Sequence, residues 1–292
     1  MWLAERAGVA IISADSRQVY RGFDIGTAKP TVEERARVPH YGVDVVEPTH
    51  RYSAAQWSAS ADAWIDDARA GGRQALVVGG TGLYLRALFH GFFTQPELDL
   101  DRRRALEHVL AGMERDELRR WVAQLDPERV HLGRTQLLRA VEVALLTGRR
   151  VSALHREHAR PARWRAHYLL VDPGAGLAGR ITTRLDAMFD RGWADEVEAL
   201  MRTVPDDAPA WKATGYRQVR MMVRGERTRA EARESIVIET RQYAKRQRTW
   251  FRHQLPAQRV TRFDPQAADW RDVVDRWWRE CSTVGPLRDK RA

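Results

Sequence analysis

The chain has 292 residues, 43% of them hydrophobic, so it can bury a sizeable core. It contains no apolar run of the roughly 20 residues that a membrane span requires, and Glu5 and Arg6 stand where a secretory signal would have its apolar centre, so a cytoplasmic protein is expected. The single cysteine, Cys281, excludes an internal disulfide and a cysteine-clustered zinc site. The excess of 49 Lys and Arg over 39 Asp and Glu suits an RNA partner, although GC-rich genomes also enrich arginine.

An apolar run near the start of the chain predicts a buried strand. Val9 to Ser13 are small or β-branched residues, which suits a strand that is covered on both faces in a parallel sheet. Four polar residues follow this run: Asp15, Ser16, Arg17 and Gln18. Ligands bind beyond the carboxyl ends of parallel strands, so Asp15 is a candidate site residue. The alternative is a loop carboxylate that caps the next helix or pairs with Arg17.

A second strand end of interest lies further along the chain. The elements before it are a helix at 32–37, a strand at 43–46 and a helix that begins after the N-cap Ser53 and runs to about Ala70. A strand at 75–78 then leads into Gly79-Gly80-Thr81-Gly82 and another helix. Such a turn can present backbone amides and the Thr81 hydroxyl to an anion, but tight strand-to-helix connections also select glycine for steric reasons alone.

The pattern changes to helix in the middle of the chain. Residues 99–124 are charged and helical, and the following helix, with Thr135 as its cap, ends at Gly148. A strand at 168–171 restores the alternation of an open α/β sheet. Helices at 179–191, 194–202 and 229–253 complete the chain, and the tail at 261–292 suggests no function. The expected fold is an α/β open parallel sheet flanked by helices, with core segments at 1–95 and 156–292 and a helical insertion at 96–155.

The long helix at 229–253 carries a row of cations. Arg241, Lys245, Arg248 and Arg252 are spaced four, three and four apart, which places them on one face, with only Glu239 in reach to neutralise them. A solvated face with mobile side chains is one interpretation, and binding of RNA or a diphosphate is the other. Trp250 in the same helix is expected to pack in the core.

Three stretches closely resemble the signatures of the tRNA dimethylallyltransferases. They are IISADSRQVYRGFDIGTAKPT at 11–31, VVGGTGLYLRAL at 77–88 and RQYAKRQRTWFR at 241–252. The resemblance implies a P-loop-NTPase-like fold. It also implies transfer of a dimethylallyl group from dimethylallyl diphosphate to the exocyclic amine of the adenosine 3′-adjacent to the anticodon. Mg²⁺ would accompany the diphosphate, and a monomer that binds the anticodon stem-loop of tRNA is expected.

The same resemblance assigns roles to particular residues. Asp15 matches the general base, and Thr81 matches a catalytic position that contacts substrate. Diphosphate candidates are Thr81, Arg217 and Arg241. The implied tRNA contacts are Asp15, Ser16, Arg17, Gln18, Arg103, Gln136, Leu137, Leu138, Arg139, Ala140, Gly215, Tyr216, Arg217, Gln218, Lys245, Arg246, Gln247, Arg248 and Arg252. The aromatic, amide and cation of the segment at 215–218 suit stacking and hydrogen bonding to unpaired bases.

One departure from the family concerns the element that cradles phosphate. No G-x-x-x-x-G-K-S/T motif occurs in the sequence, and residues 1–8 have the pattern of the last turns of a helix. The chain is therefore expected to begin inside a βαβ unit, with an exposed edge or a gap beside the strand at 9–13. A misplaced initiation codon is the simplest explanation. This form is expected to bind tRNA and to transfer prenyl groups poorly. Two alternatives stay open: a tRNA-binding protein without transfer activity, and a prenyltransferase of free adenine nucleotides, which would need neither the insertion nor the cationic row.

Metal-binding residues are not apparent. The nine histidines are scattered, and none has the spacing of a zinc pair. Mg²⁺ would therefore enter only with the diphosphate.

Overall fold

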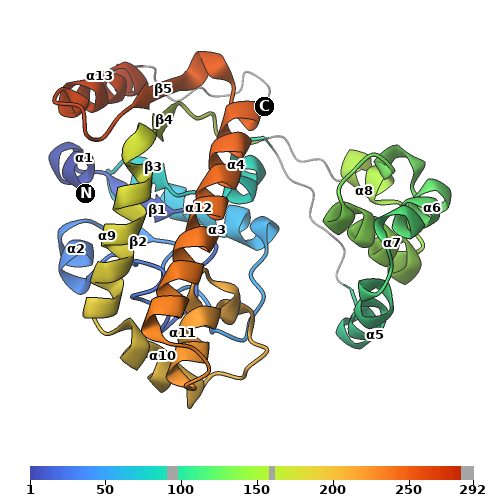
Figure 1. Ribbon diagram of the computed structural model, residues 1–292. Helices are drawn as coiled ribbons and strands as arrows, with labels where there is room; N and C mark the ends of the chain where they lie inside the picture. Colours follow the sequence, from blue (N-terminus) through green and yellow to red (C-terminus); the bar gives the residue numbers. More distant parts are fainter. Residues whose placement is uncertain (91–97, 158–161, 284–292) are drawn as a thin grey trace. The chain divides into compact units, whose positions relative to one another are not determined.

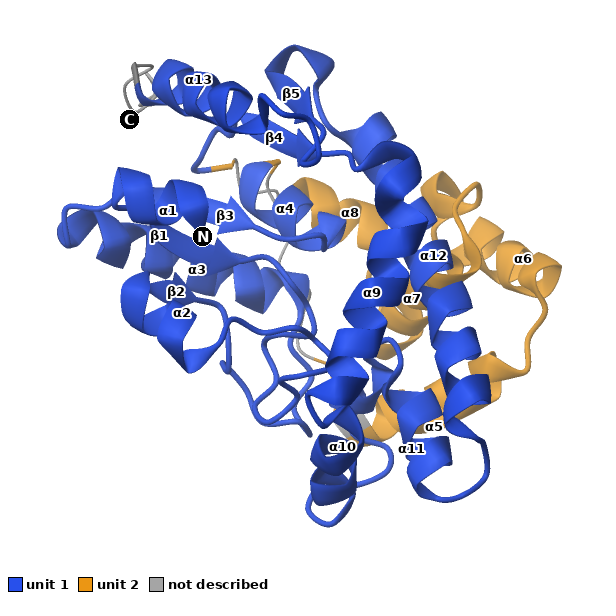
Figure 2. Cartoon of the chain, turned by 60° about the vertical axis from the view of Figure 1, so that its left-hand side comes forward, with its two compact units in different colours: residues 1–89, 163–292 blue, residues 90–162 orange. Residues whose placement is uncertain are grey.

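The computed structural model describes residues 1–90, 98–157 and 162–283 (Figure 1). The chain forms two compact units, one from residues 1–89 with 163–292 and the other from residues 90–162 (Figure 2). The sequence had placed the borders of the insertion at 95/96 and 155/156, inside the second unit.

The first unit contains a parallel sheet of three strands in the order β2-β1-β3. β1 (Ala10–Ser13) is buried throughout and lies between β2 (His40–Tyr41) and β3 (Ala75–Val78). The buried strand predicted at 9–13 is therefore confirmed. The gap expected beside it is wrong, because both edges of β1 are hydrogen-bonded to neighbouring strands.

The strand predicted at 43–46 is wrong. The extended segment is β2, which ends before Gly42, and Gly42 and Asp44 have φ angles of +77° and +56° that break the extended conformation. Only Val46 makes an isolated bridge, to Tyr20.

Helices from the first third of the chain fix the end of β1. α1 (Trp2–Ala7) ends at Gly8, α2 spans Val32–Arg37, α3 spans Ala54–Ala70 with Ser53 as its N-cap, and α4 spans Gly82–Phe89. Trp57 of α3 is fully buried, stacks on Tyr84 of α4 with ring centroids 4.6 Å apart, and donates a hydrogen bond to the Ser13 carbonyl at 3.0 Å. The N-cap predicted at Ser53 is confirmed.

The last strands form a second sheet. β4 (Tyr168–Val171) pairs in parallel with β5 (Val260–Phe263), and α13 (Trp270–Thr283) follows. Neither β5 nor α13 was predicted from the sequence, and β4 was expected in the first sheet. A mainly apolar cavity of about 1010 Å³ lies between β3 and β4 instead. Val78 and Val171, at the ends of these strands, are 47% and 54% exposed.

A layer of helices completes the first unit. It consists of α9 (Leu177–Asp190), α10 (Trp193–Met201), α11 (Tyr216–Val223) and α12 (Arg229–Gln254), with short 3₁₀ turns at Gly174–Gly176, Pro209–Lys212 and Ala257–Arg259. α9 and α12 run side by side (Figures 1 and 2). Their neighbours pack an aromatic cluster in which Phe23 contacts Trp211 and Tyr216.

The second unit is helical in its described residues. It contains α5 (Leu100–Ala111), α6 (Arg115–Leu125), a 3₁₀ turn at Pro127–Arg129, α7 (Arg134–Thr147) and α8 (Val151–Glu157) around a core of Leu110, Leu118, Val122, Leu137 and Val141. The N-cap of α7 is Gly133 and not Thr135 as predicted, because Gln136 accepts a hydrogen bond from the Gly133 amide at 3.0 Å.

Candidate functional site

Asp15 lies just beyond the carboxyl end of β1 and is half-buried. Its Oδ1 accepts hydrogen bonds from the backbone amides of Arg17 at 2.7 Å and Gln18 at 3.4 Å. In the described part of the chain, Asp15 forms no ion pair with the Arg17 side chain, which was the alternative interpretation. Its Oδ2 accepts no hydrogen bond there. One carboxylate oxygen is thus fixed by the loop, and the other is available to accept a proton.

Thr81 joins the end of β3 to the loop that carries Asp15. Its amide donates to the Ala14 carbonyl at 3.1 Å, and its Oγ1 accepts from the Ser16 amide at 3.0 Å. The ends of β1 and β3 therefore meet. The Thr81 N–H is already used, so the hydroxyl proton is the donor this residue can offer to an anion.

Gly79 has a steric reason to be glycine. A Cβ placed there would lie 2.3 Å from the Ala14 carbonyl oxygen, which is well inside van der Waals contact. The steric interpretation of the glycine-rich turn therefore holds at this position.

α12 packs on the same turn. Gln247 Nε2 donates to the Gly80 carbonyl at 3.0 Å, and the ring of Trp250 lies 2.4 Å from where a Cβ of Gly82 would stand. Trp250 packs on this turn but is only half-buried, so it does not lie in the core as expected. Tyr243 of this helix was not singled out from the sequence. Tyr243 is 37% exposed, but the protein around its phenol raises the pKa of Tyr243, and the negative charge of Asp15 raises it further.

Arg184 of α9 is a second residue that sequence reasoning missed. Surrounding protein lowers the pKa of its guanidinium, although the side chain remains open to solvent, and the charge of Asp15 acts in the opposite direction. The only feature of the sequence that marks Arg184 is its place next to the buried residues Ile181, Leu185 and Met188 of the same helix. That signal does not relate it to a carboxylate 169 positions earlier.

The cations of α12 are exposed but not equivalent. Arg248 pairs with Asp172, after β4, at 3.3 Å, whereas Arg241, Lys245 and Arg252 form no ion pair among the described residues. The expectation that only Glu239 could neutralise this row is wrong, because a nonlocal carboxylate reaches it. Glu239 instead accepts a hydrogen bond from Gln218 at 2.9 Å. Arg246 lies over the Tyr243 ring, 5.8 Å from its centroid.

The segment at 215–218 divides into buried and exposed residues. Tyr216 has no exposed surface, and its hydroxyl donates to Glu196 at 2.6 Å. This side chain cannot stack on a base and supports the core instead. Arg217 is exposed and Gln218 is half-buried, so both remain able to contact a ligand.

In the second unit, a buried carboxylate organises the predicted RNA contacts. Glu142 is 5% exposed and pairs with both Arg103 and Arg139. Arg103 also pairs with Glu107 at 3.1 Å. The remaining residues divide by exposure: Gln136 is exposed, Leu138 is half-buried, and Leu137 and Ala140 are fully buried. The last two can position neighbours but cannot touch RNA.

Metal clusters and membrane-spanning helices are not found among the described residues. No group of three or more His, Cys, Asp or Glu side chains there could hold a metal ion. No helix in those ranges is long and apolar enough to cross a membrane.

The fold and the site together define a class of protein. A parallel sheet flanked by helices, with structural neighbours that are tRNA isopentenyltransferases, is the P-loop-NTPase-like fold class that the sequence predicted. The full-length tRNA isopentenylpyrophosphate transferase of Bacillus halodurans is similar, with a TM-score of 0.66 and 31% identity over 96% of this chain and 90% of that one. A eukaryotic dimethylallyltransferase acting on tRNA shares the fold, with a TM-score of 0.75 at 22% identity, over 99% of this chain and 77% of that one.

The sequence comparisons identify the family. The profile of the IPP transferase family matches residues 18–254. The tRNA dimethylallyltransferase of Myxococcus xanthus is 46% identical over 257 residues, which cover 86% of this chain and 83% of that protein. The chain belongs to the IPP transferase family, as its signatures indicated.

Proposed function

We propose that this protein transfers a dimethylallyl group from dimethylallyl diphosphate to the exocyclic amine of the adenosine 3′-adjacent to the anticodon in tRNA. Family membership supports the class of reaction. The observation that carries the assignment of the site is the Asp15 carboxylate, which stands at the end of the central strand with Oδ1 held by two amides and Oδ2 unbonded among the described residues.

The chemistry follows from this geometry. The exocyclic amine of adenosine is a weak nucleophile, so a base that takes its proton as the C–N bond forms lowers the barrier. Asp15 Oδ2 accepts that proton. The allylic C–O bond breaks at the same centre, and its electron pair leaves with the diphosphate. The Thr81 hydroxyl, Arg217 and Arg241 are the candidates that stabilise this developing charge.

The partner is the anticodon stem-loop. The cations of α12 and the residues Arg103, Gln136 and Arg139 of the second unit are the groups proposed to contact its backbone. The target adenosine has to be turned out of the loop to reach a carboxylate at a strand end. We also propose that the protein acts in the cytoplasm, where it would meet tRNA, and that it acts as a monomer.

Mg²⁺ is proposed to bind with the diphosphate. The described residues supply no cluster of three ligands, which does not fit a metal cage built by the protein. The ion would be held chiefly by phosphate oxygens and water, as is common for Mg²⁺. No step above depends on it.

The test is a transfer assay with two acceptors. The protein is incubated with dimethylallyl diphosphate and either a tRNA transcript or AMP, and nucleosides are identified by mass; binding of the same tRNA is measured in parallel. We expect slow formation of prenylated adenosine from tRNA, as the missing G-x-x-x-x-G-K-S/T motif predicts, and unmodified AMP. Binding of tRNA without transfer would indicate a binding protein, and preferential modification of AMP would indicate an adenylate prenyltransferase. Either result would contradict the proposal.

A further inference from the structure

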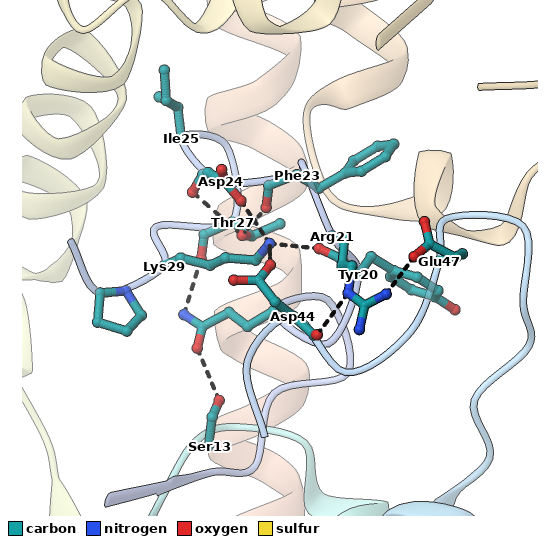
Figure 3. A network of polar contacts seen from close by, with 12 residues as sticks. Ser13, Tyr20, Arg21, Phe23, Asp24, Ile25, Thr27, Lys29, Asp44 and Glu47 are labelled. Carbon is teal, nitrogen blue, oxygen red and sulfur yellow. Dashed lines mark hydrogen bonds and ion pairs between the residues drawn. The ribbon is translucent and has the colours of Figure 1, made fainter. Parts of the chain in front are cut away.

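The buried side chain of Lys29 stabilises the loop that begins with Asp15. The side chain of Lys29 is 2% exposed, and its Nζ donates to the Tyr20 carbonyl at 2.5 Å, to Asp24 Oδ1 at 2.6 Å and to Asp44 Oδ1 at 2.5 Å (Figure 3). An ammonium group has three protons to donate, so all of its hydrogen-bonding capacity is used. Lys29 therefore has no donor left for a substrate.

The charges around Lys29 balance. Arg35 Nη2 donates to Asp44 Oδ2 at 2.6 Å, which makes a network of two cations and two carboxylates. Burial alone would raise the pKa of Asp44, but the hydrogen bonds from Lys29 and Arg35 outweigh it and hold this pKa below its ordinary value. Loss of Lys29 would leave Asp24 and Asp44 facing each other without the charge between them.

The network also holds the residues next to the proposed base. Gln18 Nε2 donates to the carbonyls of Thr27 and Ala28, which directly precede Lys29, at 3.2 and 3.0 Å. The Gln18 carbonyl accepts from the amide of Asp44 at 3.1 Å. Asp44 is one of two non-glycine residues with positive φ in the described chain, and its two ion pairs hold it in that conformation. Gln18 is therefore hydrogen-bonded both to the two residues before Lys29 and to Asp44, which is the ion-pair partner of Lys29.

We propose that Lys29 is a positioning residue for the transfer reaction. It holds the segment from Asp15 to Gln18 so that the free carboxylate oxygen of Asp15 meets the substrate amine, and it does so without touching the substrate. The proposal rests on the proposed function. It differs from a purely structural role because it requires the rate of the chemical step to change more than tRNA affinity does.

The test compares Lys29→Met with Arg21→Gln. Arg21 lies in the same loop; its Nε donates one exposed hydrogen bond to the Asp44 carbonyl at 3.1 Å, and its ion pair with Glu47 is exposed, so its loss removes little and leaves the Asp44 carboxylate paired. For Lys29→Met we expect the single-turnover rate at saturating tRNA to fall about tenfold or more, since small misplacements of reacting groups are costly, while the Kd for tRNA changes by less than about threefold. The amides of Ser16 and Arg17, which bond Thr81 and Asp15, should exchange hydrogen faster. Arg21→Gln should stay within about twofold of the wild type in all three measurements.

Two results would overturn the proposal. One is a Lys29→Met protein that transfers at the wild-type rate; the other is a fall in rate that a loss of tRNA affinity fully accounts for. If Lys29→Met does not fold, Asp24→Ala truncates a side chain that is 57% exposed and removes one partner of Nζ; an unchanged transfer rate in that variant would also overturn the proposal. A wild-type protein that fails to transfer contradicts the proposed function, and unchanged exchange at Ser16 and Arg17 in Lys29→Met then contradicts the positioning role.

Discussion

At the scale of single residues, the two carboxylate oxygens of Asp15 differ in their hydrogen bonds. Oδ1 is fixed by loop amides, so the carboxylate is oriented before any substrate binds. The Asp15→Asn variant keeps the size of the side chain and can still accept at one oxygen, but it no longer acts as a base. The single-turnover rate should fall by about 10²–10⁴-fold, with tRNA affinity nearly unchanged. Retention of most of the rate would remove Asp15 from this role.

Gly79 is where the approach of the two strand ends is tightest. Gly79→Ala would place a methyl group 2.3 Å from the Ala14 carbonyl oxygen, and the backbone has to shift to make room. We expect a loss of about 1–3 kcal/mol in unfolding free energy, measured by urea denaturation. Gly112→Ala is the control, because nothing lies within 4 Å of the added group. Equal stability of the two variants would contradict the close contact.

The contribution of Asp44 to the free energy of unfolding should be lost in acid. Its folded pKa is lowered, so its contribution to stability is present above the unfolded pKa and is lost as pH falls through the folded pKa. The difference in unfolding free energy between wild type and Asp44→Asn should therefore be largest near neutral pH and shrink below about pH 4. Thermal denaturation of both proteins between pH 7 and pH 3 measures this, and a difference that grows on acidification would contradict it.

At the scale of elements, α12 has one face that packs on the site and one that is exposed. Gln247 and Trp250 face the turn after β3, while Arg241, Lys245 and Arg252 extend into solvent without ion pairs among the described residues. The helix is thus fixed to the site and remains available to a polyanion.

The three unpaired cations should carry the salt dependence of tRNA binding. Each phosphate contact contributes about 0.9 to the slope of log affinity against log salt, so replacing Arg241, Lys245 and Arg252 by Gln should reduce the slope by about two to three. Replacing Arg202, an exposed arginine paired with Glu198 on α10, is the control. An unchanged slope in the triple variant would mean that the row is only a solvated face.

Local signals in the sequence predicted many of the elements. The apolar run of β1, the Ser53 cap of α3 and the length of α12 each depend on neighbours in the chain, and the structure confirms them. The strand predicted at 43–46 failed because Asp44 takes a left-handed conformation that is stabilised by Lys29 and Arg35. That interaction leaves no trace in hydrophobic periodicity.

At the scale of the whole molecule, the interactions that build the site are nonlocal, and they explain what the sequence did not predict. β4 pairs with β5, about 90 residues later, and strand pairing of this kind cannot be read from one segment. Gln247 reaches Gly80, and Asp172 reaches Arg248. The burial of Tyr216 also depends on partners far away in the chain, including Glu196 and Phe23. Local sequence patterns therefore predicted single elements better than the contacts between distant segments.

The central claim is that Asp15 supports transfer of a prenyl group to one adenosine of tRNA. The most direct measurement is mass-spectrometric mapping of ribonuclease fragments of tRNA after incubation with dimethylallyl diphosphate and either the wild-type protein or Asp15→Asn. We predict a dimethylallyl group on the adenosine 3′-adjacent to the anticodon with the wild type, and at most a trace of it with the variant over the same time. Equal modification by both proteins, or modification at another position, would contradict the account.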